Sequence, residues 1–97
     1  MNTVPMPDPH PHAYSRLYQL REAMAAKGFA VELSGYVLTV VAPVDHGPRF
    51  MEEVTCRPRR DDGNRPWFFD SRGKPIVEAD HITDAMVALS GMLRPTP

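Results

Sequence analysis

Apolar residues recur at three- and four-residue steps near both ends of the chain, which is the spacing of one face of an α-helix. The first such segment covers residues 11–27, and its apolar stripe is Ala13, Leu17, Leu20 and Met24. Gly28 follows it, at the place where a left-handed residue commonly ends a helix. The second segment runs from Asp80, a predicted N-cap, to about Arg94. Its apolar positions are Ile82, Ala85, Met86, Leu89, Met92 and Leu93.

Between these segments the pattern changes to the two-residue alternation of β-strands. The predicted strands cover residues 29–33, 36–41, 50–57 and 67–69. Ser34 and Gly35 form a turn between the first two strands, and the turn-forming residues 61–64 connect the last two. Residues 75–77 add a short edge piece before the second helix.

The order of these elements, α-β-β-β-β-α, predicts an α+β fold of two layers. Both helices are expected on one face of an antiparallel sheet, with the other face at least partly exposed to water. A chain of 97 residues, with 42% hydrophobic and 24% charged residues, has the composition of one folded domain. We predict this domain over residues 11–94. Proline-rich residues 1–10 and the short segment 95–97 are predicted to be disordered tails.

Charge, apolar run length and cysteine content indicate which partners and which compartment to expect. Eleven basic and twelve acidic residues give a net charge of −1, so no overall positive field attracts nucleic acid or an anionic membrane. The longest apolar run, around residues 36–44, is too short to cross a bilayer. The single cysteine, Cys56, cannot form an internal disulfide, which favours a reducing compartment. We therefore expect a cytoplasmic protein that does not bind membranes.

The most distinctive polar stretch combines arginines with an aromatic residue, at Arg57, Arg59, Arg60, Arg65 and Trp67. Arginines beside aromatic side chains are typical of surfaces that bind single-stranded nucleic acid. However, Asp61, Asp62 and Asp70 lie in the same stretch and cancel much of its charge. Aromatic packing and solvated hairpin ends explain the stretch better, so nucleic-acid binding is the alternative hypothesis.

Other reactive side chains are better explained by packing than by chemistry. Cys56 alternates within a predicted strand and fits a small buried residue better than a nucleophile activated by His46 or His81. His10 and His12 lie next to the prolines of the N-terminal segment, whereas a strong metal site needs three or four ligands on rigid elements. We therefore expect no catalytic residue, no metal site and no cofactor.

Met51 is the methionine of greatest interest, because methionine is common at adaptable binding surfaces. If the strands pair as predicted, Val37, Thr39 and Val41 can share its face of the sheet. Such an apolar surface, away from the helices, would receive a partner.

Three segments carry a resemblance to a group of known proteins: Val54–Pro58, Trp67–Phe69 and Gly73–Ala79. At these residues the chain resembles small uncharacterised actinobacterial proteins. In those proteins a Cys-Arg-Pro strand and an aromatic strand precede a Gly-x-Pro-Ile turn into the final helix. The resemblance spans Glu53 to Leu89. It implies a regulatory or accessory role and assigns no catalytic residue.

The leading hypothesis is a non-catalytic interaction module that acts through its sheet face or sheet edge. Its partner would be another protein or a second copy of the chain, because so small a core gains from further burial of apolar area. The alternatives are a nucleic-acid accessory protein that uses Arg57 to Arg65, and a small-ligand or enzymatic role in a pocket between helices and sheet.

Overall fold

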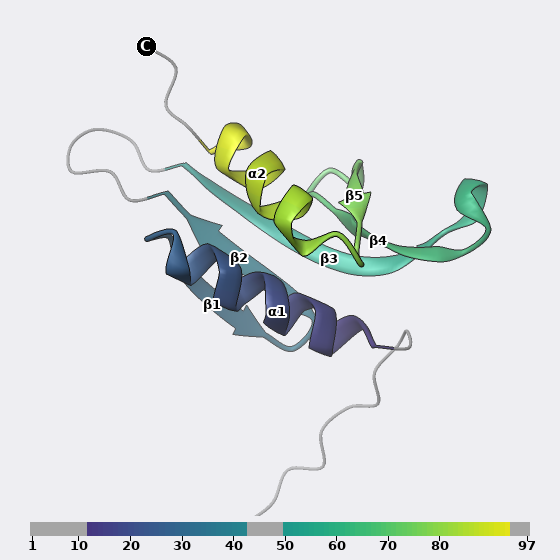
Figure 1. Ribbon diagram of the computed structural model, residues 1–97, viewed down its shortest axis with the longest axis horizontal. Coiled ribbons are helices and arrows are strands. Elements are labelled where there is room, and N and C mark those ends of the chain that lie inside the picture. Colours follow the sequence, from purple (N-terminus) through teal and green to yellow (C-terminus); the bar gives the residue numbers. More distant parts are fainter. Residues whose placement is uncertain (1–11, 43–49, 94–97) are drawn as a thin grey trace, which may run out of the picture.

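An antiparallel sheet with helices on one face makes up the residues that the computed structural model describes, 12–42 and 50–93 (Figure 1). Within these ranges the sheet has five strands in the order β1-β2-β3-β4-β5, which is a meander. The elements are α1 Ala13–Ala26, β1 Ala30–Ser34, β2 Val37–Val41, β3 Met51–Arg59, the short 3₁₀ helix η1 Arg60–Asp62, β4 Arg65–Phe69, β5 Pro75–Glu78 and α2 Ile82–Met92. The predicted α+β class is confirmed.

The long strand β3 pairs with different neighbours along its two halves. Its first half pairs with β2, where Val54 lies opposite Leu38. Its second half pairs with β4, where Arg57 lies opposite Trp67. The β1–β2 hairpin and the β4–β5 hairpin therefore flank opposite ends of β3. A single strand thus carries Met51 and two of the arginines that the sequence indicated as binding residues, Arg57 and Arg59.

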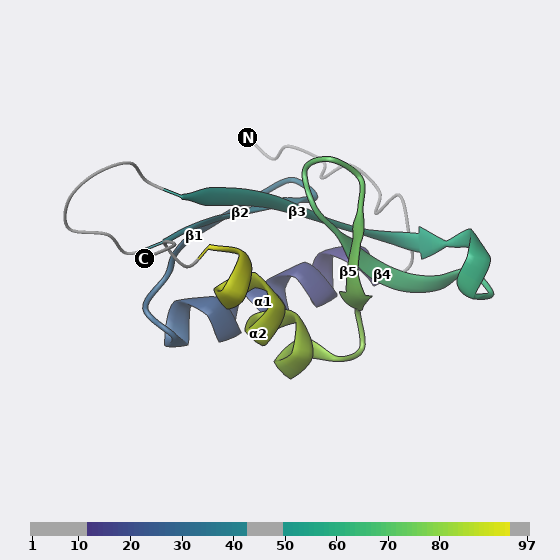
Figure 2. The ribbon, with the colours of Figure 1, turned by 90° about the horizontal axis from the view of Figure 1, so that it is seen from above.

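The core lies between the sheet and the helices, which both pack on the same side of the sheet (Figure 2). The predicted stripe of α1 is buried, with each member at most 1% exposed: Ala13, Leu17, Leu20 and Met24. Ala85 and Leu89 of α2 are also buried. The strands contribute Leu38, Val40, Val54, Cys56 and Phe68. Since strand side chains alternate between faces, the residues between these positions point away from the helices.

The end of α1 is fixed by Gly28, as the sequence predicted. Gly28 has a φ of 95°, and its N–H donates to the carbonyl of Ala25. The N–H of Phe29 donates to the carbonyl of Met24. These two hydrogen bonds form a Schellman motif, in which glycine accepts the left-handed conformation at little cost. The motif turns the chain from α1 into β1 and so places the helix against the sheet.

Several details differ from the prediction. Residues 75–77, predicted as a short edge piece, belong to the edge strand β5, in which Val77 lies opposite Phe68. Met92, predicted on the apolar stripe of α2, is 43% exposed. The prediction that Asp80 caps α2 is wrong, because His81 occupies the N-cap position and no side chain caps it. The Asp80 carboxylate instead forms an ion pair with Arg16, which holds the start of α2 against α1. The predicted disordered tails, 1–10 and 95–97, lie outside the described residues.

Candidate functional site

The face of the sheet opposite the helices carries all the strand residues that the sequence indicated as binding residues. Leu38 and Val40 of β2 and Val54 and Cys56 of β3 are buried on the helix side. Figure 2 shows α1 and α2 on that side only. We call the opposite surface the open face. Its residues are Ala30, Glu32 and Ser34 of β1, Val37, Thr39 and Val41 of β2, Met51, Glu53, Thr55, Arg57 and Arg59 of β3, and Arg65, Trp67 and Phe69 of β4.

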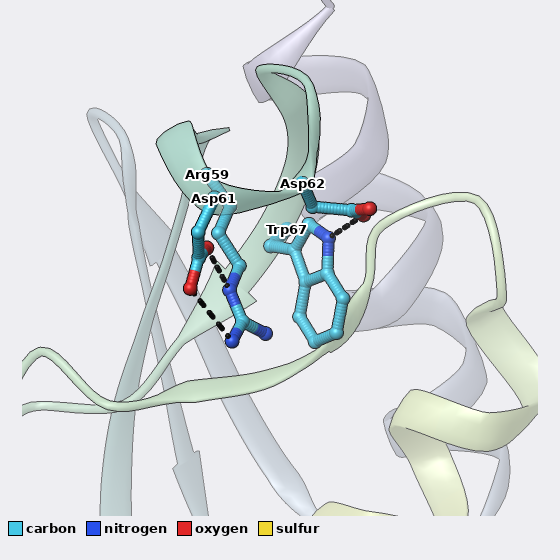
Figure 3. Close-up of polar contacts among 4 residues, drawn as sticks. All are labelled: Arg59, Asp61, Asp62 and Trp67. Atoms are coloured by element: carbon cyan, nitrogen blue, oxygen red, sulfur yellow. Dashed lines mark hydrogen bonds and ion pairs between the residues drawn. The ribbon is translucent and has the colours of Figure 1, made fainter.

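Arg59 and Trp67 form a pair that donates hydrogen bonds to the two carboxylates of η1 (Figure 3). The Arg59 Cζ lies 4.3 Å from the centroid of the Trp67 ring. Arg59 Nε donates to Asp61 Oδ1 at 2.6 Å, and Nη2 donates to Oδ2 at 3.3 Å. The Trp67 Nε1–H donates to Asp62 Oδ2 at 2.7 Å. Both carboxylates of η1 are therefore bound to this pair.

The bidentate contact shifts the titration of both of its partners. The hydrogen bond from Arg59 lowers the pKa of Asp61 below its ordinary value. The same hydrogen bond raises the pKa of Arg59 above its ordinary value. Arginine and carboxylate have matching planar geometries, which makes such forked contacts among the stronger ion pairs. The charge of Arg59 is thus neutralised within the hairpin itself.

Arg57 and Phe69 form a second pair, one step along the same hairpin. The Arg57 Cζ lies 4.1 Å from the centroid of the Phe69 ring. Phe69 is only 6% exposed although it lies outside the main core cluster, and the Arg57 side chain lies over its ring. No carboxylate among the described residues forms an ion pair with Arg57. Its guanidinium is therefore supported by a ring but keeps its full charge.

A hollow of about 370 Å³ lies beside these arginines. Its lining includes Arg57, Arg59, Arg60, Asp61 and Phe69. Arg60 is exposed at the start of η1, and no ion pair joins it to another described residue. Since Asp61 already binds Arg59, the hollow has an excess of positive charge.

The predicted binding residues are therefore brought together only in part. Arg57, Arg59 and Trp67 share the open face, and Arg65 lies opposite Arg59. Met51 shares this face but belongs to the other half of β3, opposite Val41. Met51 lies six positions before Arg57 on the extended strand, which corresponds to a distance of about 20 Å. The open face thus has an apolar end at Met51 and a cationic end at the β3–β4 hairpin.

The structure favours packing over chemistry for Cys56, as the sequence indicated. Cys56 is 5% exposed and belongs to the core cluster on the helix side of β3. His81 is exposed, and its Nδ1 lies 3.8 Å from Asp84 Oδ2. His10 and His46 lie outside the described residues. In the ranges 12–42 and 50–93, no group of three or more potential metal ligands comes together.

Sequence reasoning missed the role of Phe69 and an aromatic cluster elsewhere. Phe69 supports Arg57 because the hairpin register places the two residues diagonally across neighbouring strands. On the helix side, Tyr14 lies 6.5 Å from Tyr18 and 6.2 Å from Tyr36, measured between ring centroids. The four-residue spacing of Tyr14 and Tyr18 was the available signal for this cluster.

Comparisons with known proteins add no relative: no family model, no curated protein and no solved structure matches the chain. The resemblance to the small actinobacterial proteins stays a prediction. None of the described helices has the length and apolar character needed to cross a bilayer.

Proposed function

We propose that this protein is a non-catalytic interaction module that binds a protein partner through its open face. The observation that carries the proposal is Met51, whose side chain is 56% exposed on that face. Val41 lies directly opposite it on β2, and Val37 lies on the same face of that strand, beyond Thr39. Grouped apolar side chains on an exposed sheet face gain free energy when another protein covers them.

The proposal extends to a regulatory or accessory role in the cytoplasm. The resemblance to small actinobacterial proteins supports that role, and the single cysteine supports a reducing compartment. A second copy of the chain belongs among the partners that this surface could receive. The size of the described core, which a dimer would extend, supports that option.

Nucleic-acid binding has less support from the geometry. A stacking platform needs an open ring face, whereas Arg57 and Arg59 already lie over the rings of Phe69 and Trp67. Arg59 is neutralised by Asp61. Glu32 and Glu53 also lie on the open face, where they would repel a phosphate backbone.

The test compares two charge insertions at exposed apolar residues. Met51→Lys places a charge on the open face, and Val87→Lys places one on α2, where Val87 is 62% exposed. Light scattering on size-exclusion fractions measures self-association. Capture from a lysate of the source organism, with the tagged full chain, measures other partners. We expect Met51→Lys to weaken the interaction by about tenfold or more, because the partner would have to bury an unpaired charge. Val87→Lys should behave as wild type.

Two results would contradict the proposal. One is a strictly monomeric protein that retains nothing from the lysate. The other is an interaction that Met51→Lys leaves intact, since the surface used would then lie elsewhere. Circular dichroism of both variants checks that the fold is preserved.

A further inference from the structure

We infer that the Arg57–Phe69 pair is a binding site for a carboxylate group, supplied by an acidic segment of the protein partner. This inference rests on the proposed function, because it names the chemistry of a group that the open face receives. The site is the hollow of about 370 Å³ at the cationic end of that face.

The neighbouring pair shows what Arg57 lacks. Arg59 lies over an aromatic ring at nearly the same distance as Arg57, and it binds the Asp61 carboxylate through two nitrogens. Arg57 has the ring without the carboxylate. The same hairpin therefore contains one arginine that binds a carboxylate of its own chain and one whose guanidinium can bind a carboxylate of a partner.

The setting of Arg57 suits a bidentate ligand. Phe69 is buried beneath the guanidinium, so water is excluded from one side of the cation and its interaction with an anion is strengthened. A guanidinium that lies over a ring keeps the N–H groups at its edge available for hydrogen bonds. At Gly73, an added Cβ would come within 3.6 Å of Arg57 Nη2, so the absence of a side chain there leaves space beside these N–H groups.

The charges around the hollow favour a carboxylate side chain over the phosphate backbone of a nucleic acid. Arg60 lines the hollow and provides a second positive charge. Asp61 lines it too, and Glu53 lies on the same face, four residues before Arg57 on β3. A carboxylate side chain occupies only the hollow, whereas a nucleic-acid backbone would extend over these acidic residues. An aspartate or glutamate of a protein segment is therefore the ligand that fits.

The experiment follows the arginine Nε–Hε signals of the full, ¹⁵N-labelled chain by NMR. The probe is a capped tetraglutamate peptide, with capped tetraglutamine as the uncharged control. We expect the Arg57 signal to shift saturably with tetraglutamate and the Arg59 signal to change much less. Arg57→Lys keeps the charge but loses the fork, and should weaken binding by about tenfold. Arg21→Lys is the matched control, because Arg21 also lies near a ring, that of Tyr18, but on α1.

Three outcomes would overturn the inference. These are an unmoved Arg57 signal, equal shifts of all arginine signals, and equal binding by the Arg57→Lys variant. If a single-stranded oligonucleotide shifts the Arg57 signal and tetraglutamate does not, the site binds nucleic acid instead. A negative NMR result would overturn the carboxylate site alone. The proposed function is tested separately, because the comparison of Met51→Lys with Val87→Lys does not involve Arg57.

Discussion

Arg57 lies over Phe69 and Arg59 lies over Trp67, with Cζ-to-centroid distances of 4.1 and 4.3 Å. The two pairs follow each other along the same two strands and use the same side-chain chemistry. They differ in what the adjacent loop supplies. The 3₁₀ helix η1 places Asp61 against Arg59 and Asp62 against the indole N–H, but it provides no carboxylate for Arg57.

An arginine that lies over an aromatic ring can therefore have two different roles in one hairpin. The Arg59–Trp67 pair binds both carboxylates of η1, so its contribution is to hold the hairpin end in shape. The Arg57–Phe69 pair has an apolar support and an unneutralised charge, which is the arrangement of a site that awaits a ligand. Sequence composition alone treats these arginines as equivalent.

The largest effect that separates the two pairs is expected from Phe69→Ala. Phe69 is 6% exposed, and truncation of a buried phenylalanine leaves a cavity, so the free energy of unfolding should fall by about 3–5 kcal/mol. Phe69→Leu, which retains most of the apolar volume, should cost less than about 1.5 kcal/mol. Urea denaturation of both variants gives these values. A loss below about 1 kcal/mol for Phe69→Ala would mean that the ring is not an essential support.

A smaller loss of stability is expected on acidification. Of the two pairs, only the Arg59 pair contributes to it. The folded-state pKa of Asp61 lies below its ordinary value of 3.8. The stabilisation from its contact with Arg59 is therefore fully present above pH 3.8 and is lost as the pH falls through the lower pKa of the folded state. A carboxyl ¹³C NMR titration measures this midpoint. A midpoint at or above 3.8 would show that the contact does not persist in solution.

The helices and the fold class could be predicted because apolar spacing reports burial directly. The α1 stripe from Ala13 to Met24 is buried as its periodicity indicated, and Gly28 ends the helix by a local conformation that glycine favours. The strand alternation also placed Cys56 in the core. These features depend on neighbouring residues in the chain, so sequence reasoning reaches them.

The remaining features depend on contacts between distant residues. Asp80 looks like an N-cap, but its carboxylate pairs with Arg16, which is 64 positions earlier in the chain. Likewise, the sequence of residues 57–67 shows that arginines, aspartates and Trp67 are present. It does not show which carboxylate binds which arginine. That assignment needs the register of β3 and β4 and the shape of η1. The cationic region can therefore be located from the sequence. The different carboxylate contacts of Arg57 and Arg59 cannot.

In the free protein Arg59 already binds a carboxylate, whereas the guanidinium of Arg57 is available to bind one. The most direct test is the rate at which the two arginine Nε–Hε protons exchange with water in the free protein. Because Arg59 Nε donates to Asp61, its proton should exchange more slowly than that of Arg57, and Asp61→Ala, which removes the acceptor, should remove most of the difference. Equal rates in the wild-type protein, or slower exchange at Arg57, would contradict the account.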